Sequence, residues 1–301
     1  MGGGLKTTSL SFFMIFKFNK VYIIESLPEN EMKTGKSLYE EFFHHNDVDN
    51  RYDFEYQSIK NANGFKTFLE IVFSEIKDKG VFPIIHFEMH GGKEGLRLSS
   101  SEVIQWKDLA FRLLKMNIEL KNKLVVVFAL CYGVHFLSAF YEFMDFRTPF
   151  AGLIASTDYV KAGEIKYGFQ KFYKMILETK NGNDAIKGLN ELINEEDRRY
   201  SFLSCRWLFK EAFVQYLKLC SAKERNKRTE RIITKIKSTN PNAEITKIRK
   251  ELKEYLHKNN QEKYFITARD KFLMYDLDGS NKSLFAIEYH EIMGEKSTTL
   301  H

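Results

Sequence analysis

Short apolar runs alternate with longer amphipathic segments along the first 220 residues of the chain. The runs are rich in β-branched and aromatic side chains, which is typical of buried strands. The segments between them place apolar residues three and four positions apart, as helices do. We expect strands at residues 20–25, 52–56, 82–89, 123–130, 150–155 and 200–204. Regular alternation of strands and helices predicts an α/β fold, with a mostly parallel sheet covered by helices on both faces.

The segment between the third and fourth expected strands has a pattern of its own. Residues 95–98 are expected to form a small hairpin over the sheet. Ser101 is expected to open a helix that carries Val103, Trp106 and Leu109. This helix would lead the chain into the next strand.

The composition changes after residue 220. Residues 223–258 are dense in Lys, Arg and Glu with scattered apolar side chains, which predicts a helical hairpin interrupted near Pro241. Residues 272–287 contain two apolar runs separated by Asp-Gly-Ser-Asn, which predicts a β-hairpin. We therefore expect one domain over residues 1–220 and an accessory region of helices and a β-hairpin over residues 221–301.

Composition and cysteine content narrow the class of protein. The chain has 301 residues, a formal net charge of +6 and three cysteines. Such scattered cysteines form neither a disulfide framework nor a metal-binding motif, which favours a reducing compartment and a cytoplasmic protein. The apolar run at residues 10–16 lacks the flanks of a signal peptide and is expected to be an edge strand. No run approaches the ~20 apolar residues that a bilayer requires, so we expect no membrane contact.

Two of the expected strands end on a reactive side chain. His90 follows the run 82–89 and precedes Gly91, and Cys131 follows the run 123–130. In open α/β sheets, active sites gather beyond the carboxyl ends of the strands. A histidine and a cysteine at such ends are a candidate base and nucleophile. The helix expected after Cys131 would favour its thiolate form, and Gly91 would offer an unobstructed N–H group for an oxyanion hole.

The blocks Ile-Ile-His-Phe-Glu-Met-His-Gly at residues 84–91 and Val-Val-Val-Phe-Ala-Leu-Cys-Tyr-Gly at residues 125–133 carry a family resemblance. They resemble the two catalytic blocks of the caspase-like cysteine peptidases, and within them those of the CHAT branch. The resemblance covers roughly residues 20–220. It implies a caspase-like fold for the first domain.

By this resemblance, His90 is general base and acid, Cys131 is the nucleophile, and the N–H groups of Gly91 and Cys131 bind the oxyanion. The resemblance also implies a bacterial protease linked to defence or regulated cell death, with a protein substrate and no cofactor. The residues around Cys131 depart from the Gln-Ala-Cys-x-Gly signature of animal caspases, so specificity for aspartate is not implied. The alternative is a catalytically silent adaptor with the same fold.

The family's primary specificity pocket is commonly lined by residues just before the cysteine and just after the following strand. Those positions hold Ala129, Ser156, Thr157 and Asp158. Because a carboxylate pairs well with arginine or lysine, Asp158 predicts cleavage after a basic residue. A capping role for Asp158 is the alternative.

His86, Glu88 and His90 alternate along one expected strand and therefore share one face. A zinc hydrolase would require a further strong ligand at suitable spacing, and the sequence offers none, so no metal is expected. We expect His86 and Glu88 to support His90 through a polar relay, or to be buried residues satisfied by hydrogen bonds.

The segment 223–231 is strongly basic. We expect its cations to lie on a solvated helix face. The alternative is that they contact a phosphate backbone or an acidic partner. Interleaved aromatic residues are missing, so nucleic acid is not expected as a partner. By analogy with the family, the accessory region is expected to bind an activating or sensor protein.

Overall fold

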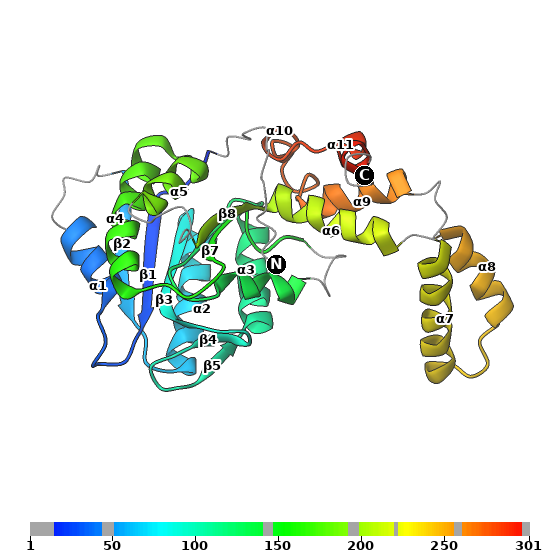
Figure 1. Ribbon diagram of the computed structural model, residues 1–301, viewed down its shortest axis with the longest axis horizontal. Helices are drawn as coiled ribbons and strands as arrows, with labels where there is room; N and C mark the ends of the chain where they lie inside the picture. Colours follow the sequence, from blue (N-terminus) through cyan, green and yellow to red (C-terminus); the bar gives the residue numbers. More distant parts are fainter. Residues whose placement is uncertain are drawn as a thin grey trace, which may run out of the picture. The chain divides into compact units, whose positions relative to one another are not determined.

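The computed structural model describes residues 15–43, 51–140, 147–191, 199–219, 222–255 and 261–296, and it confirms an α/β fold (Figure 1). The chain divides into two compact units. The first contains the described residues up to Phe140 and from Pro149 to Ser204. The second contains Arg147, Thr148 and the described residues from Cys205 onward.

The first unit is built around a mixed, mostly parallel sheet. Its strands are β1 (Lys20–Ser26), β2 (Asp53–Ser58), β3 (Pro83–Gly91), β4 (Gly95–Arg97), β5 (Val103–Gln105), β6 (Val125–Phe128), β7 (Gly152–Ser156) and β8 (Tyr200–Ser204). The main path runs in the order β2-β1-β3-β6-β7-β8. Neighbours from β2 to β7 are parallel, whereas β8 is antiparallel to β7. β4 and β5 form a hairpin that pairs with the end of β3.

Helices cover both faces of this sheet. They are α1 (Thr34–Ser37), the π-helix η1 (Leu38–Phe43), α2 (Ala62–Lys79), α3 (Trp106–Glu119), the 3₁₀ helix η2 (Gly133–Phe140), α4 (Ala162–Thr179) and α5 (Gly182–Asn190). Phe87 and His86 are consecutive in β3, so their side chains point to opposite faces. Phe87 packs against Phe65 of α2, and His86 packs against Phe169 of α4. Hence α2, with its neighbour α3, covers one face, and α4, with α1 and α5, covers the other (Figure 1).

One element of the first unit begins later than its pattern predicts. The helix expected from Ser101 begins at Trp106, because residues 103–105 pair with β4 as strand β5. Ser101 itself has a φ of 71°, in the left-handed region that helices do not use. The hairpin predicted at residues 95–98 is confirmed as β4 paired with β5.

The second unit is helical in its described part. Its elements are α6 (Cys205–Leu219), α7 (Ala222–Thr239), α8 (Ile245–Tyr255), α9 (Gln261–Phe272), α10 (Asn281–Leu284) and α11 (Tyr289–Lys296). The unit boundary lies at Cys205, whereas composition places it after residue 220. Packing explains the difference, because Phe209 and Phe213 of α6 lie 5.4 and 5.1 Å from Phe265 of α9 between ring centroids.

The β-hairpin predicted at residues 272–287 is wrong. These residues contain the end of α9, a series of turns and α10, and no strand. The Asp-Gly sequence forms a turn before α10 instead, in which the carboxylate of Asp278 accepts the N–H of Ser280 at 2.9 Å. Asn281 then donates its side-chain N–H groups to the C=O groups of Leu273 and Met274, which closes the turn.

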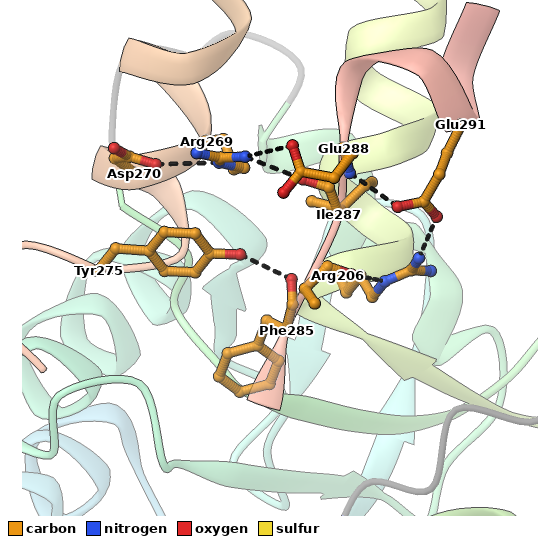
Figure 2. A network of polar contacts seen from close by, with 9 residues as sticks. Arg206, Arg269, Asp270, Tyr275, Phe285, Ile287, Glu288 and Glu291 are labelled. Carbon is orange, nitrogen blue, oxygen red and sulfur yellow. Dashed lines mark hydrogen bonds and ion pairs between the residues drawn. The ribbon is translucent and has the colours of Figure 1, made fainter. Parts of the chain in front are cut away.

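Polar contacts fix the segment 285–291, which follows α10 (Figure 2). Arg269 donates to the C=O of Ile287 at 3.1 Å. Arg206 of α6 forms an ion pair with Glu291, with a separation of 2.6 Å between Nη2 and Oε2. The two arginines therefore tie the segment to α9 and α6.

No helix in the described part of the chain is long and apolar enough to cross a bilayer.

Candidate active site

The ends of three neighbouring strands converge at one edge of the sheet. β1, β3 and β6 are adjacent and parallel, so their carboxyl ends meet at the same edge. His90 lies in the last part of β3, and Cys131 lies just beyond β6. The pairing extends past β6, because the N–H of Ala129 donates to the C=O of Phe87 at 3.0 Å. The sheet thus delivers a base and a thiol to neighbouring positions, as the sequence predicts.

Gly91 lies directly against the backbone of Cys131. A Cβ atom at Gly91 would lie 2.1 Å from the carbonyl oxygen of Cys131 and 2.3 Å from Leu130 Cδ1. No side chain fits there, so glycine is required by the close approach of the two strand ends. The close approach is to the carbonyl group of Cys131, and the use of the N–H groups of Gly91 and Cys131 as an oxyanion hole stays a prediction.

His90 contacts a carboxylate, Glu31, that no local sequence pattern reveals. Its Nε2 lies 3.0 Å from Oε2 and 3.1 Å from Oε1 of Glu31. Glu31 follows β1, in a turn in which its own N–H donates to the C=O of Pro28 at 3.1 Å. Nδ1 of His90 forms no hydrogen bond within the described residues. The position of Glu31, after the strand beside β3, is the sequence signal that could have found it.

Cys131 is partly exposed and sits in a constrained turn. Its Sγ accepts the N–H of Val160 at 3.4 Å and lies 3.7 Å from the C=O of the same residue. The next residue, Tyr132, has a φ of 57°, which is unusual for a residue with a bulky side chain. The N–H of Tyr132 donates to the C=O of Asp158 at 3.0 Å, which holds this turn against the chain that follows β7.

Two residues expected to line a specificity pocket are buried instead. Ala129 is 2% exposed and Ser156 is fully buried. Ser156 Oγ donates to the C=O of Leu130 at 2.5 Å and accepts the N–H of Gly133 at 3.5 Å. Ser156 therefore bonds the residue before Cys131 and the second residue after it. These bonds support the turn that carries the cysteine, and the buried hydroxyl is not exposed to a substrate. Sequence spacing places both residues near the cysteine but does not reveal which way they point.

Asp158 lies on the exposed side of the same turn. Its Oδ1 accepts the N–H of Tyr159 at 2.7 Å, and its Oδ2 lies 3.9 Å from Nη1 of Arg199. The negative charge of Asp158 raises the pKa of the Tyr132 hydroxyl. The structure thus brings Asp158 next to the residue that follows Cys131, and it also shows the local hydrogen bond of the capping alternative.

His86 and Glu88 are both buried on the face of the sheet that α4 covers. Nε2 of His86 lies 2.9 Å from Oε1 of Glu88, and Nδ1 lies 3.0 Å from the hydroxyl of Tyr173. Glu88 also accepts the hydroxyl of Thr34. Burial and the nearby Glu88 charge raise the pKa of Tyr173. These contacts satisfy the buried groups, and within the described residues no hydrogen bond joins them to His90, whose bonded partner is Glu31.

A second buried carboxylate, Glu25, lies beside Glu88, and no local sequence pattern reveals it. Glu25 of β1 is the register partner of Glu88 in β3, and it is 1% exposed. It accepts the hydroxyl of Tyr56 at 2.7 Å and the N–H of Gly35 at 2.8 Å. Because Thr34 and Gly35 follow Glu31 in the chain, the two buried carboxylates anchor the segment that carries the partner of His90.

Within the described residues, no group of three or more His, Cys, Asp or Glu side chains is placed to hold a metal ion. His86 and Glu88 contact each other, while the imidazole of His90 contacts Glu31. The three residues that share one strand face therefore belong to two separate sets of contacts.

No protein-family model and no curated protein matches this sequence.

Proposed function

We propose that this protein is a cysteine endopeptidase that uses His90 and Cys131 to cleave a protein substrate at a few sites. The observation that carries the proposal is the convergence of β3 and β6, whose adjacent carboxyl ends present these two side chains. The contact between Glu31 and His90 supports it, because a base that is oriented by a third group is typical of nucleophilic catalysis. The resemblance to the caspase-like CHAT branch supports a role in bacterial defence or regulated cell death, in the cytoplasm.

The proposed chemistry gives each of these groups a role. His90 would take the thiol proton of Cys131 through Nδ1, since Glu31 engages Nε2. The thiolate would attack the carbonyl carbon of the scissile bond, and the N–H groups of Gly91 and Cys131 would bind the oxyanion. His90 would then protonate the leaving amine, and a water molecule would hydrolyse the thioester, giving its proton to His90.

We further propose cleavage after a basic residue. Asp158 is half exposed and lies in the turn bonded to Tyr132, next to the nucleophile. An arginine or lysine of the substrate would pair with its carboxylate. Arg199 is the nearby cation that such a side chain would replace, at 3.9 Å from Asp158.

The second unit would act as an interaction or sensing module that receives the activating signal.

One observation favours the alternative of a catalytically silent adaptor. Sγ of Cys131 is engaged by both the N–H and the C=O of Val160. A thiol that stays in these contacts is withheld from a substrate. The enzyme therefore requires Sγ to leave Val160 on substrate binding or activation, whereas the adaptor does not.

A thiol-reactive peptide probe separates the two functions. In the enzyme, the probe labels Cys131 in the wild type, and the labelling is lost in His90→Ala. His290→Ala is the matched control, since His290 is exposed on α11 in the second unit. Equal, slow labelling of Cys131 in the wild type and in His90→Ala supports the adaptor. Comparison of cleavage termini made in a native lysate by the wild type and by Cys131→Ala then identifies the substrate and the cleaved bond.

A further inference from the structure

The second unit carries a basic helical hairpin, formed by α7 and α8. Residues 222–255 contain eleven Lys and Arg residues against five Glu residues. The formal charge of the whole chain is +6, so the basic hairpin carries the entire excess and the remaining residues are balanced. Charge of one sign that is gathered on a small module creates a strong local potential.

The hairpin turns its apolar side chains inward and its cations outward. Ile233 is 3% exposed, and Ile232, Ile236, Ile248 and Leu252 are half-buried. No large apolar side chain in the described part of the hairpin is exposed. Its exposed cations include Lys227, Arg231 and Lys235 on α7 and Lys247, Lys250 and Lys253 on α8. The outer surface is therefore polar, and its exposed cations outnumber its exposed carboxylates.

The spacing of these cations opposes helix stability. Lys227, Arg231 and Lys235 follow one another at intervals of four residues, so they line one side of α7. Like charges at this spacing destabilise a helix. Lys227 has an ion pair with Glu224 at 2.8 Å, whereas Arg231 and Lys235 have none within the described residues. A row of cations kept at a cost to the helix indicates a use outside the chain.

The carboxylates of the hairpin are too few to neutralise it. Both oxygens of Glu230 are bonded by Arg249 at 2.9 Å. This bonding, together with the nearby charges of Lys253 and Lys237, lowers the pKa of Glu230. The carboxylate of Glu230 thus interacts with three cations, of which only Arg249 is hydrogen-bonded to it. The positive potential of the surface remains largely uncompensated within the hairpin.

We propose that the basic hairpin binds the phosphate backbone of double-stranded nucleic acid. Lysine and arginine bind duplex phosphates through charge alone, without contacts to bases. Interfaces with proteins commonly use apolar or aromatic anchors, and helices that lie on a membrane commonly use an exposed apolar face. The described part of the hairpin exposes no large apolar side chain. Residues 222–254 contain no aromatic residue, which argues against stacking on single strands, a contact that a duplex backbone does not require. This inference does not depend on the proposed peptidase activity.

The test measures binding of the full-length protein to a fluorescent DNA duplex of random sequence, by anisotropy at about 50 to 200 mM salt. The variant Arg231→Gln/Lys235→Gln/Lys250→Gln removes three exposed cations. Each lost phosphate contact lowers the slope of log K against log salt by about 0.9, so we expect a slope that is smaller by about 2.7 and weaker binding. The matched control is Lys66→Gln/Lys77→Gln/Lys263→Gln, which removes the same charge from exposed sites on α2 and α9.

The control variant should bind the duplex as the wild type does. Cys131→Ala should also bind normally, which separates this inference from the function of the sheet edge. Equal loss of binding in both triple variants would overturn the proposal, because it would show a response to net charge alone. Tighter binding to polyglutamate or to anionic vesicles than to the duplex would assign the surface to another partner, and would overturn it as well.

Discussion

Glu25 and Glu88 face each other across the parallel strands β1 and β3, and both are almost completely buried. Burial, with a contribution from the charge of Glu88, raises the pKa of the Glu25 carboxyl group, although Tyr56 and the N–H of Gly35 bond its ionised form. Ionising the Glu25 carboxyl group in this buried position therefore costs free energy. The protonation state of Glu25 is therefore linked to the segment that carries Glu31, because Gly35 of that segment donates its N–H to Glu25.

The first prediction is that Glu25→Gln changes the pH dependence of stability. Because the pKa of Glu25 is raised in the native state, the native protein binds more protons than the unfolded chain above about pH 4, where unfolded glutamate ionises. Wild-type stability should fall as the pH rises from there through the native pKa, and Glu25→Gln should lack this part of the fall. Urea unfolding at several pH values measures it. Glu119→Gln, exposed on α3, is the control, and parallel wild-type and Glu25→Gln curves would contradict the assignment.

The second prediction is that Glu31→Gln lowers catalytic efficiency by about 100-fold, because His90 loses the partner that fixes its ring. Both side chains are substantially exposed, so the free energy of unfolding should change by less than about 1 kcal/mol. Glu29→Gln is the matched control, two residues away and exposed. Kinetics on the identified substrate and thermal unfolding are measured together. Full activity in Glu31→Gln would remove Glu31 from the site.

The third prediction compares two neighbouring glycines. Gly91→Ala should cost about 3 kcal/mol or more and should disturb the site, since its Cβ would overlap the carbonyl oxygen of Cys131. Gly92→Ala should be nearly neutral, because no atom lies within 4 Å of the added Cβ. Denaturant unfolding and Cys131 probe labelling report the two effects. Similar stability of both variants would show that the strand ends are less closely packed than described.

The fourth prediction concerns the support of the cysteine turn. Ser156→Ala leaves the buried C=O of Leu130 without its donor, so it should destabilise the protein by about 1 to 3 kcal/mol. Thr157→Ala, at the adjacent exposed position, should change stability much less. Denaturant unfolding measures both. If Ser156→Ala retains wild-type stability and instead raises KM, Ser156 would return to the substrate-binding role that its sequence position suggests.

The fifth prediction is that Asp158→Asn abolishes a preference for basic residues at the cleaved position. Fluorogenic peptides with Arg, Lys, Leu and Asp at that position give kcat/KM for the wild type and the variant. Asp78→Asn, exposed on α2, is the matched control. A wild-type preference for Leu or Asp, or an unchanged basic preference in Asp158→Asn, would place the pocket elsewhere.

Local patterns predicted most of the sheet and placed His90 and Cys131 at two strand ends. The apolar runs that end at His90 and Cys131 are strands β3 and β6, because a strand that is buried on both faces requires consecutive apolar residues. Their parallel pairing follows from the helix between them. The prediction of a β-hairpin at residues 272–287 failed because an Asp-Gly turn can lead into a helix as readily as into a second strand, and only packing decides between these outcomes.

The sequence by itself determined the alternation of strands and helices, the reactive residues at two strand ends and the concentration of charge in the basic hairpin, since each is a property of neighbouring residues. Only the tertiary structure decided that Glu31 holds His90, 59 positions away in the chain, and that Ser156 faces the core. It also decided that Glu25 faces Glu88. Such contacts depend on which strands become neighbours and on the direction of each side chain, and the free energy that fixes both comes from packing the whole core.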